Sequence, residues 1–464
     1  MTSTIKVNTI QNTCGADIIK ESSNTITIGA SGDTVTLASG ASQSGFGRTG
    51  AVDWNTTVKT ADFTATDGDG FFINAAGGDI TVTLPSSPSA GAIVGLSDYN
   101  GSATSNTITI ARNGSNINGN ADNLILSKDN AAVQLVYVDA TTGWQNITTA
   151  NPSDISNPFV AATGGSTTEE GNFKIHTFTS PGTFTVSSAG SPSGSTTVEY
   201  LVVAGGGSGA AKGPGDGGGG GGAGGFRFAS PTLAPLTFPA KPLNGPAALP
   251  VSVQGYPITV GGGGSAASAP GGPCAPAGNG ANGANSVFSS ITSTGGGKGG
   301  YNPSRGSGTG SPGGSGGGGN AGSPSPVAGG SGNTPPVTPA QGKDGGSSIF
   351  PSSPNSQGGA GGGATAVGAN GSPGVAAGGA GAGLPTGFGA NGESCGSFRY
   401  YAGGGAGGRR EPSNGSGGVG GGGDTNAAGT DNTGGGGGAG GANGSPSAGF
   451  NGGSGIVVIR YKFQ

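Results

Sequence analysis

Short segments in which a large apolar residue alternates with threonine recur along the chain. "NTITI" occurs at Asn24–Ile28 and Asn106–Ile110, "DTVTL" at Asp33–Leu37 and "DITVTL" at Asp79–Leu84. Successive side chains of a strand point to opposite faces, so each segment can bury one face and leave the other in water. No convincing apolar stripe has helical spacing, and glycine and β-branched residues disfavour helices. The pattern predicts an all-β fold.

The strands fall into regions that differ in apolar content. Residues 1–50 hold two or three strands, too few for a monomeric core, and we interpret them as an N-terminal attachment or shaft segment stabilised by other copies. Residues 51–150 predict a compact module, a β-sandwich or jelly roll. Residues 151–171 are interpreted as a linker. The expected core of the module is Trp54, Phe63, Phe71, Phe72, Leu84, Ile93, Val94, Leu124, Leu126, Leu135, Val136, Tyr137, Val138 and Trp144.

Residues 172–464 predict a glycine-rich domain framed by strands. The chain has 110 glycines among 464 residues, roughly three times ordinary usage. Long glycine-rich excursions separate the predicted strands, and the last strand has a strong apolar edge. A flexible tail would not need such a closing strand. The predicted frame strands are Asn172–Val186, Thr197–Gly205, Val251–Gly261, Ser286–Ser293 and Gly455–Phe463.

The glycine-rich excursions predict an array of polyglycine-II type. Fixing a residue costs about 1–2 kcal/mol of backbone entropy, and glycine loses the most freedom. Polyproline-II-type helices have three residues per turn and no internal hydrogen bonds, so glycine-rich copies can bond to their neighbours. "GAN" recurs in this phase at Gly280–Asn285, Gly368–Pro373, Gly389–Ser394 and Gly441–Pro446, which keeps glycine on one face. The alternative is a flexible Gly/Ser linker.

Charged and chemically reactive residues are scarce. Charged residues make up 9% of the chain, the net charge is −4 and no basic block occurs, which excludes a nucleic-acid partner. No apolar run approaches membrane-spanning length, so we expect no membrane insertion. Cys14, Cys274 and Cys395 have neither the spacing of a disulfide framework nor that of a zinc site.

No catalytic apparatus is visible in the sequence. The only histidine, His176, lies in an alternating strand and is interpreted as a strand residue. Gly205-x-Gly207-x-x-Ala210 imitates a dinucleotide fingerprint but is not followed by a helix-forming sequence. Asp67 and Asp69 lack a third ligand for calcium, which favours a hairpin turn. We therefore expect no enzyme activity, no cofactor and no metal site.

A few aromatic and basic residues interrupt the glycine and are candidates for receptor binding. Tyr and Arg are enriched in binding hot spots, and loops on a rigid scaffold often carry recognition. The alternative is that these rings pack over glycine faces and seal the array. The candidates are Tyr301, Arg305, Phe398, Arg399, Tyr400, Tyr401, Arg409 and Arg410.

The chain resembles bacteriophage tail-fibre proteins of the marine and cyanobacterial type. The likeness rests on "STIKVNTIQNTCGADIIKESSNTITIGASGDTVTLASGA" near the start, on "NGSNINGNADNLILSKDNAAVQLVYVDATTGW", and on the frame "HTFTSPGTFTV", "VEYLVVAGGG" and "GGSGIVVIRY". It implies a trimeric fibre with its N-terminal end toward the particle and a distal glycine-rich domain. The first residues also lack the basic and apolar regions of a secretory signal. This fits a virion component that is made in the host cytoplasm and acts outside the cell.

The expected function is that of a non-enzymatic fibre that binds a host surface polysaccharide or outer-membrane protein by multivalent contacts. Its N-terminal segment would contact other tail proteins of the virion. The alternative is a structural fibre, either attached to the capsid or part of an extracellular filament, without receptor specificity.

Overall fold

The structure is a computed structural model, and it divides into two units, Met1–Asp53 and Trp54–Gln464, which are described separately. Strands form most of the regular structure, which confirms the all-β fold class. Within the described residues the helical segments are two short 3₁₀ turns, η2 (Lys241–Leu243) and η3 (Thr386–Phe388). The described residues are 9–11, 17–22, 25–28, 52–126, 128–148, 155–156, 159–190, 194–212, 217–233, 237–266, 268, 280–301, 308–322, 325–349, 356–372, 376–409, 415–441 and 447–463.

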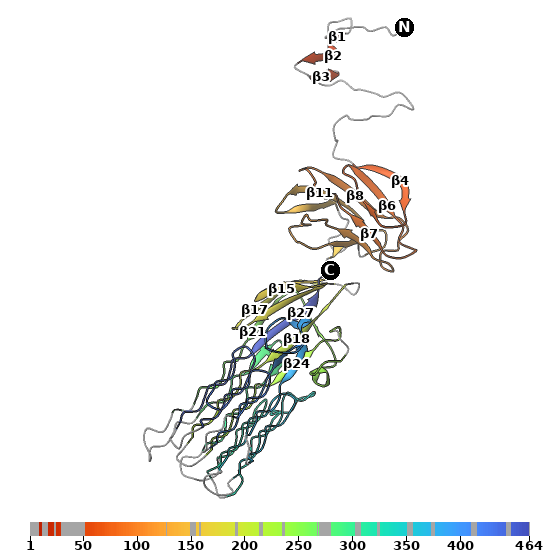
Figure 1. Ribbon diagram of the computed structural model, residues 1–464. Coiled ribbons are helices and arrows are strands. Elements are labelled where there is room, and N and C mark those ends of the chain that lie inside the picture. Colours follow the sequence, from red (N-terminus) through yellow and green to blue (C-terminus); the bar gives the residue numbers. More distant parts are fainter. Residues whose placement is uncertain are drawn as a thin grey trace. The chain divides into compact units, whose positions relative to one another are not determined.

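The N-terminal unit contains a three-stranded antiparallel sheet in the order β1-β2-β3 (Figure 1). Its strands are β1 (Thr9–Gln11), β2 (Asp17–Ser22) and β3 (Thr25–Ile28). The first "NTITI" segment therefore forms a strand as predicted. The "DTVTL" segment at 33–37 lies outside the described residues.

Residues 52–148, with β13, form two five-stranded sheets, in the orders β12-β11-β8-β6-β4 and β13-β10-β9-β7-β5. One apolar cluster draws on both sheets, from Phe71 and Trp144 in one to Val82 and Leu126 in the other, which makes this module a sandwich. The pairs β6–β8, β5–β7 and β7–β9 are parallel, whereas a jelly roll is antiparallel. The strands are β4 (Asp53–Lys59), β5 (Phe63–Thr64), β6 (Asp69–Ile73), β7 (Ile80–Thr83), β8 (Ile93–Asp98), β9 (Ile108–Ala111), β10 (Leu124–Leu126), β11 (Ala132–Asp139), β12 (Gly143–Thr148) and β13 (Ile155–Ser156).

The predicted core of this module is correct except at two positions. Strands β7 and β9 alternate buried and half-buried residues, as their Ile/Val–Thr pattern predicts. Trp54 and Val138 are 40% and 42% exposed, whereas the other predicted core residues are buried or half-buried. Trp54 lies on the edge strand β4 and packs on Phe72, with ring centroids 4.9 Å apart, above a glycine at position 70. Its apolar surface therefore covers the outside of the sheet.

The last part of the chain is framed by a five-stranded sheet, β14-β17-β21-β22-β23, and a larger sheet, β15-β16-β27-β18-β19, in which β20 also pairs with β18. A third, small sheet has the order β24-β26-β25. All the frame strands expected from the sequence are present. The strands are β14 (Val160–Thr163), β15 (Ser166–Glu170), β16 (Phe173–Phe178), β17 (Gly182–Ala189), β18 (Thr197–Val203), β19 (Phe226–Ala229), β20 (Leu249–Pro250), β21 (Gly255–Thr259), β22 (Ser286–Phe288), β23 (Ile291–Ser293), β24 (Ala382–Pro385), β25 (Glu393–Cys395), β26 (Phe398–Tyr401) and β27 (Ile456–Lys462).

The segment 151–171, expected to be a linker, contributes strands to both neighbouring parts. β13 pairs with β10, β14 pairs with β17, and β15 pairs with β16. The difference has a simple cause. The alanines of "VAAT" and the glutamates of "STTEE" are depleted in strands, and neither segment alternates apolar with polar residues, so the sequence gives no strong strand signal. The edges of β17 and β16 supply partners for their backbone groups.

Strands β18 and β27 are adjacent and are buried on both faces. Val202 and Val457 face one apolar cluster, between the two large sheets, whereas Leu201 and Val458 face a second cluster that also contains Phe388 and Tyr401. β27 lies between β16 and β18, so the predicted closing strand fills the centre of its sheet. The frame is therefore a layered structure with a core on each side of this sheet.

The glycine-rich excursions pack as extended threads beside this frame, running side by side away from the sheets in Figure 1. Successive residues of one thread bond in rotating directions. Gly206 and Gly209 donate to Gly453 and Phe450, whereas Gly207 and Ala210, each one residue later, donate to Gly222 and Gly219. Every third residue thus meets the same antiparallel neighbour. That period is the three-residue turn of the polyproline-II type of helix, as predicted.

The thread 217–225, which contains the six consecutive glycines Gly217–Gly222, has six neighbours among the described residues. Its amides donate to carbonyls of three threads and its carbonyls accept from amides of three others, all with N···O distances of 2.8–3.3 Å. The accepting threads are 294–300, 359–362 and 434–437, and the donating threads are 204–210, 315–321 and 405–408. Backbone groups thus bond the thread to a neighbour on every side, and side chains add bonds only at its ends, from Asn320 to the Gly217 carbonyl and from Ser293 to the Gly225 carbonyl.

Glycine is required here because the threads approach too closely for a side chain. A Cβ added to Gly219, Gly220 or Gly221 would lie within 3.0 Å of a carbonyl oxygen on three different neighbours, Gly318, Gly405 and Gly207. The obstacle in each case is backbone, which cannot rotate away. The same rule explains the "GAN" phase, because Gly368 and Gly371 are buried and Asn370 is exposed.

Outward asparagines cap the edge of the array. Asn282 and Asn285 lie three residues apart, and their Oδ1 atoms accept hydrogen bonds from the amides of Lys298 and Gly295, each at 2.9 Å. The "GANGES" copy differs, because it forms a turn that leads into β25. Most of the copy at 441–446 lies outside the described residues.

The array predicts that one methyl group in its centre is far more damaging than one at its edge. We expect Gly221→Ala to lower the free energy of unfolding by about 3 kcal/mol, because the methyl would overlap the Gly207 carbonyl. Gly262 is exposed, and a methyl group added to it would meet no other atom within 4 Å, so Gly262→Ala is the matched control. It should be neutral or stabilising by up to about 1 kcal/mol. Urea unfolding measures both, and equal losses would contradict the packed array.

His176, on β16, is buried between the two large sheets. Its Nδ1 lies 2.7 Å from the Gly164 carbonyl oxygen and its Nε2 lies 3.0 Å from the Tyr461 hydroxyl. A neutral ring satisfies both contacts, with Nδ1–H donating to the carbonyl and Nε2 accepting from the hydroxyl. Burial lowers the pKa of His176 below its ordinary value of 6.5, because a charged ring loses its hydration there.

This lowered pKa predicts acid sensitivity. The unfolded chain binds a proton at His176 near pH 6.5, whereas the folded chain resists it, so the contribution to stability is full above pH 6.5 and falls as the pH drops below that value. We expect the free energy of unfolding to decrease by up to about 1.4 kcal/mol per pH unit in this window. Urea unfolding between pH 7.5 and 5.5 measures the slope. His176→Gln should flatten it, and an unchanged slope in that variant would refute the assignment.

Candidate functional site

Strand β26 carries four of the candidate receptor-binding residues, and one of them is part of the core. Tyr401 is 1% exposed, and its hydroxyl donates to the Asn391 carbonyl oxygen at 2.7 Å. Burial raises the pKa of Tyr401 above its ordinary range, which keeps the hydroxyl protonated as a donor. Tyr401 is therefore a packing residue with no surface to offer a partner, as in the alternative that aromatic rings seal the array.

The other three residues of this strand are half-buried. Phe398 packs against the cluster that contains Tyr401, and the Tyr400 ring lies over the glycine at position 383 of the neighbouring strand β24. Arg399 is also half-buried. Part of each side chain is thus accessible, and Arg399 and Tyr400 remain candidates for contact with a partner.

Tyr301 and Arg409 lie at one level of the array. The residues just before them, Gly300 and Gly408, bond to the neighbouring residues Gly219 and Gly218 of the central thread. Both candidates are half-buried, and Tyr301 packs against Ala211. Arg305 and Arg410 lie outside the described residues.

The described candidates therefore form two groups rather than one patch. Arg409 follows β26 by eight residues along the thread 402–408, which at about 3.1 Å per residue separates it from Tyr401 by roughly 25 Å. A small ligand cannot contact both groups. A large partner could contact them together.

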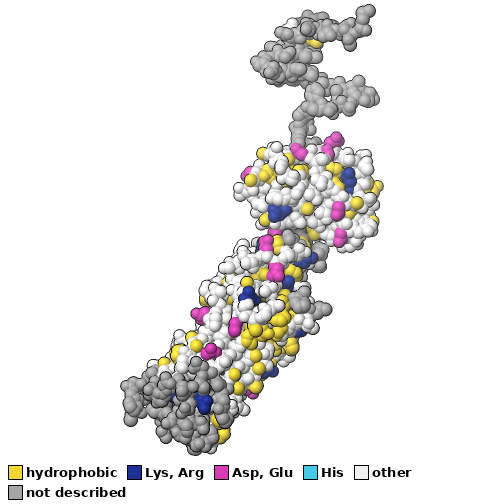
Figure 2. All heavy atoms as spheres, viewed as in Figure 1, with side chains coloured by type: hydrophobic (Ala, Val, Ile, Leu, Met, Phe, Trp, Pro, Cys, Tyr) yellow, Lys and Arg dark blue, Asp and Glu magenta, His cyan; other side chains and the backbone are white. Residues whose placement is uncertain are grey.

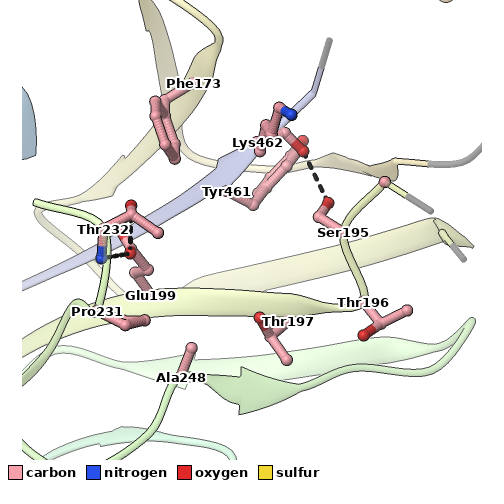
Figure 3. A pocket seen from close by; sticks show the side chains of 11 residues that line it. Phe173, Ser195, Thr196, Thr197, Glu199, Pro231, Thr232, Ala248, Tyr461 and Lys462 are labelled. Atoms are coloured by element: carbon pink, nitrogen blue, oxygen red, sulfur yellow. Dashed lines mark hydrogen bonds between the residues drawn. The ribbon is translucent and has the colours of Figure 1, made fainter. Parts of the chain in front are cut away.

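A buried ion pair, which was not predicted from the sequence, lies near β26. Glu199 on β18 and Arg460 on β27 are register partners, and Arg460 Nη1 pairs with Glu199 Oε2, with the two side chains 5% and 7% exposed. Thr232 completes the network, because its amide and hydroxyl donate to Glu199 Oε1 at 3.0 and 2.6 Å (Figure 3). Its Oγ1 also accepts from Arg460 Nη1 at 3.1 Å. The signal was present, because each residue is the one charged position within an apolar run, "VEYLVV" and "IVVIRY".

Two hollows flank this ion pair. The first, which we call the Ser195 hollow, has a volume of about 280 Å³, and its lining includes Phe173, Ser195, Glu199 and Lys462 (Figure 3). The second, which we call the Glu170 hollow, has a volume of about 500 Å³, and its lining includes Glu170, Phe173, Phe398 and Arg460. Phe173 contributes to both hollows. The Arg460 guanidinium packs on the face of its ring, with Cζ 3.5 Å from the ring centroid.

The structure assembles no other chemically reactive cluster among the described residues. No group of three or more His, Cys, Asp and Glu side chains is placed to hold a metal ion there. None of the helical segments described is long and apolar enough to cross a membrane. Charged side chains are few and scattered on the face that Figure 2 shows. Cys395 is a free, exposed thiol, and Cys14 and Cys274 lie outside the described residues.

Comparison with known proteins identifies the C-terminal part of the chain. Residues 177–462 match a family model described as a glycine-rich domain. The match begins in β16 and ends with β27, so it contains both the glycine array and most of its β frame. No curated protein matches the chain.

The buried pair predicts a large cost for removing one partner. We expect Arg460→Met to lower the free energy of unfolding by about 3–5 kcal/mol, because Glu199 would keep its charge in the interior without compensation. Lys174→Met is the matched control, since Lys174 and Glu169 form an ion pair at 3.5 Å with side chains 28% and 58% exposed. That change should cost no more than about 1 kcal/mol. Urea unfolding measures both losses. Similar values would show that the buried pair contributes no more to the free energy of unfolding than the exposed pair does.

Proposed function

The chain belongs to the glycine-rich domain family, and from this premise we propose that it is a bacteriophage tail fibre that binds a receptor on the host cell surface. The receptor would be a surface polysaccharide or an outer-membrane protein. The chain would be made in the host cytoplasm and act in the virion, outside the cell. Three chains would associate, with their N-terminal segments attached to other tail proteins.

The central thread is the observation that best supports this proposal. Because residues 217–225 are bonded to six neighbours through backbone groups, the array is stiff although it has almost no side chains. A stiff array holds the few rings and guanidiniums around it at fixed separations, which reduces the entropy lost on binding. Arg399, Tyr400, Tyr301 and Arg409 are half-buried and thus already ordered.

Repetition of a weak site would supply the affinity. A fibre carries copies of each contact, and a particle carries several fibres, so later contacts form at a high effective concentration. The roughly 25 Å between the two groups of candidates suits a large, repetitive surface better than a small molecule. The same stiffness also fits a structural fibre without a receptor, which is the competing proposal.

Attachment assays with the full chain distinguish the two proposals. We expect fluorescently labelled protein to be retained on the envelope fraction of a susceptible bacterium. One of two double variants, Arg399→Ala with Tyr400→Ala or Tyr301→Ala with Arg409→Ala, should reduce retention at least tenfold in a protein that is still fully folded at the assay temperature. Tyr99→Ala is the control, because Tyr99 is 57% exposed and lies in the β-sandwich module.

Two results would overturn the receptor-binding proposal. One is the absence of retention on every bacterial envelope fraction in a broad panel, together with filaments of the purified protein in electron micrographs. The other is retention that neither double variant changes. In electron micrographs of the virion, fibre length and attachment point would then favour a capsid-attached or filament role.

A further inference from the structure

The Glu170 hollow has the dimensions and composition of a ligand site. Its volume of about 500 Å³ falls in the range of small-molecule pockets, roughly 300–1,000 Å³. Five separate parts of the frame form it: the end of β15 with the start of β16, the segment after β19, η3 with the end of β24, the β25–β26 turn, and Arg460 of β27. The β-sheets anchor each of these parts, so the hollow exists before any ligand binds.

The hollow joins apolar faces to a few polar groups. Phe173, Phe398, Leu233 and Pro385 contribute apolar surface, and Phe398 is one of the receptor-binding candidates from the sequence. The hydroxyls of Thr386 and Ser397 also belong to the lining. Aromatic and aliphatic surface with a small number of polar groups is the usual composition of a specific small-ligand site.

A buried donor beside the hollow lacks a partner. The Nε of Arg460 is buried without a hydrogen-bond acceptor, although Nη1 of the same guanidinium bonds to Glu199 and Thr232. Arg460 is part of the lining, and its side chain is 7% exposed. Buried polar groups in folded proteins are nearly always paired. Nε has almost no accessible surface and the Phe173 ring packs on the guanidinium, so a ligand in the hollow does not contact Nε, and a buried water is the partner that would satisfy it.

A carboxylate in the lining lacks a donor. Glu170 lines the hollow, and its Oε1 lies near Gly387 of η3, 3.6 Å from where a methyl group on that glycine would be. The structure gives this carboxylate no hydrogen-bond or ion-pair partner among the described residues. Glu170 is exposed, so water solvates its carboxylate when the hollow is empty. An ionised carboxylate only accepts hydrogen bonds, so a ligand bound beside it would donate to it.

The charges exclude an anion. Glu199 already neutralises Arg460, so Glu170 leaves the hollow with a net negative charge. A phosphate or a carboxylate would be repelled. A neutral sugar fits this lining, because it is uncharged, donates and accepts hydrogen bonds, and has a C–H face that can lie on an aromatic ring.

We propose that the Glu170 hollow binds one neutral sugar unit of a surface glycan. Glu170 accepts hydrogen bonds from sugar hydroxyls, the hydroxyls of Thr386 and Ser397 add further bonds, and the Phe398 ring supports the apolar face. The site rests on the proposed function, because it assigns a chemical class to the receptor. It shares Phe398 with the candidates on β26, whereas Glu170, Phe173 and Arg460 are not among the candidates.

Sugar titrations of the full chain test this assignment. The probes are neutral glucan, galactan and mannan oligosaccharides, with oligogalacturonate as the acidic counterpart, followed by saturation-transfer NMR and calorimetry. We expect binding of at least one neutral class and at least tenfold weaker binding of oligogalacturonate. Glu170→Gln should weaken the neutral ligand at least tenfold, and Phe398→Leu, which retains most of the packing, should weaken it severalfold. Glu169→Gln is the matched control, because Glu169 is the adjacent carboxylate and pairs with Lys174.

The outcomes separate this site from the proposed function. Affinity unchanged in Glu170→Gln, or equal binding of acidic and neutral oligosaccharides, overturns the site. Absence of neutral-sugar binding by a protein that still attaches to envelopes also overturns the site, but leaves the tail-fibre proposal standing. Neutral-sugar binding that depends on Glu170, in a protein that attaches to no envelope, supports the site and counts against the tail-fibre proposal.

Discussion

The glycine-rich domain depends on hydrogen bonds between the backbones of neighbouring threads, which the central thread makes with six neighbours. A β-strand pairs within a plane and uses its two faces for side chains. In the array the bonding direction rotates at every residue, so the thread 217–225 has neighbours on all sides and no face left for a side chain. Most positions that face another thread are therefore glycine, although a few buried alanines, such as Ala406 and Ala439, also face other threads. The composition follows from this geometry.

The exceptions to glycine show where this constraint ends. Ala223 is in the same thread, yet its methyl belongs to the apolar cluster that contains Phe226 and Leu384. At that end of the thread the neighbour is a side chain from the β frame, so a methyl can be buried. Asn282 and Asn285 occur where a thread faces no further thread, and their amide oxygens take over the accepting role of a backbone carbonyl. At Ala223, Asn282 and Asn285 the sequence thus departs from glycine where the array meets the core or its edge, whereas Ala406 and Ala439 show that a methyl is also accommodated within the array.

Much of the fold could be predicted because its determinants are local. Alternation in "DITVTL", the apolar closing strand and the three-residue "GAN" phase each predict the structure found at β7, β27 and the exposed Asn370. The strands β14 and β15 could not be found in this way, because their strand conformation depends on partners distant in sequence. Tyr401 is a similar case. Its neighbours Arg399 and Tyr400 are partly accessible, and only the position of Asn391 and the second core determines that Tyr401 is buried.

The central position of β27 means that its sheet can be completed only after the end of the chain has been synthesised. Val203 of β18 pairs with Ile456 of β27. The ribosome therefore makes the central strand of the largest sheet long after it has made β16 and β18, the two strands that flank it. Until then β16 and β18 each expose an unpaired edge, and the threads between them lack a fixed boundary. Contacts of such long sequence separation form slowly, because a large loop must close before they are made. Until β27 has been synthesised, the nascent chain exposes two unpaired strand edges, which are prone to aggregate. A chaperone or a partner chain that covered these edges would protect it.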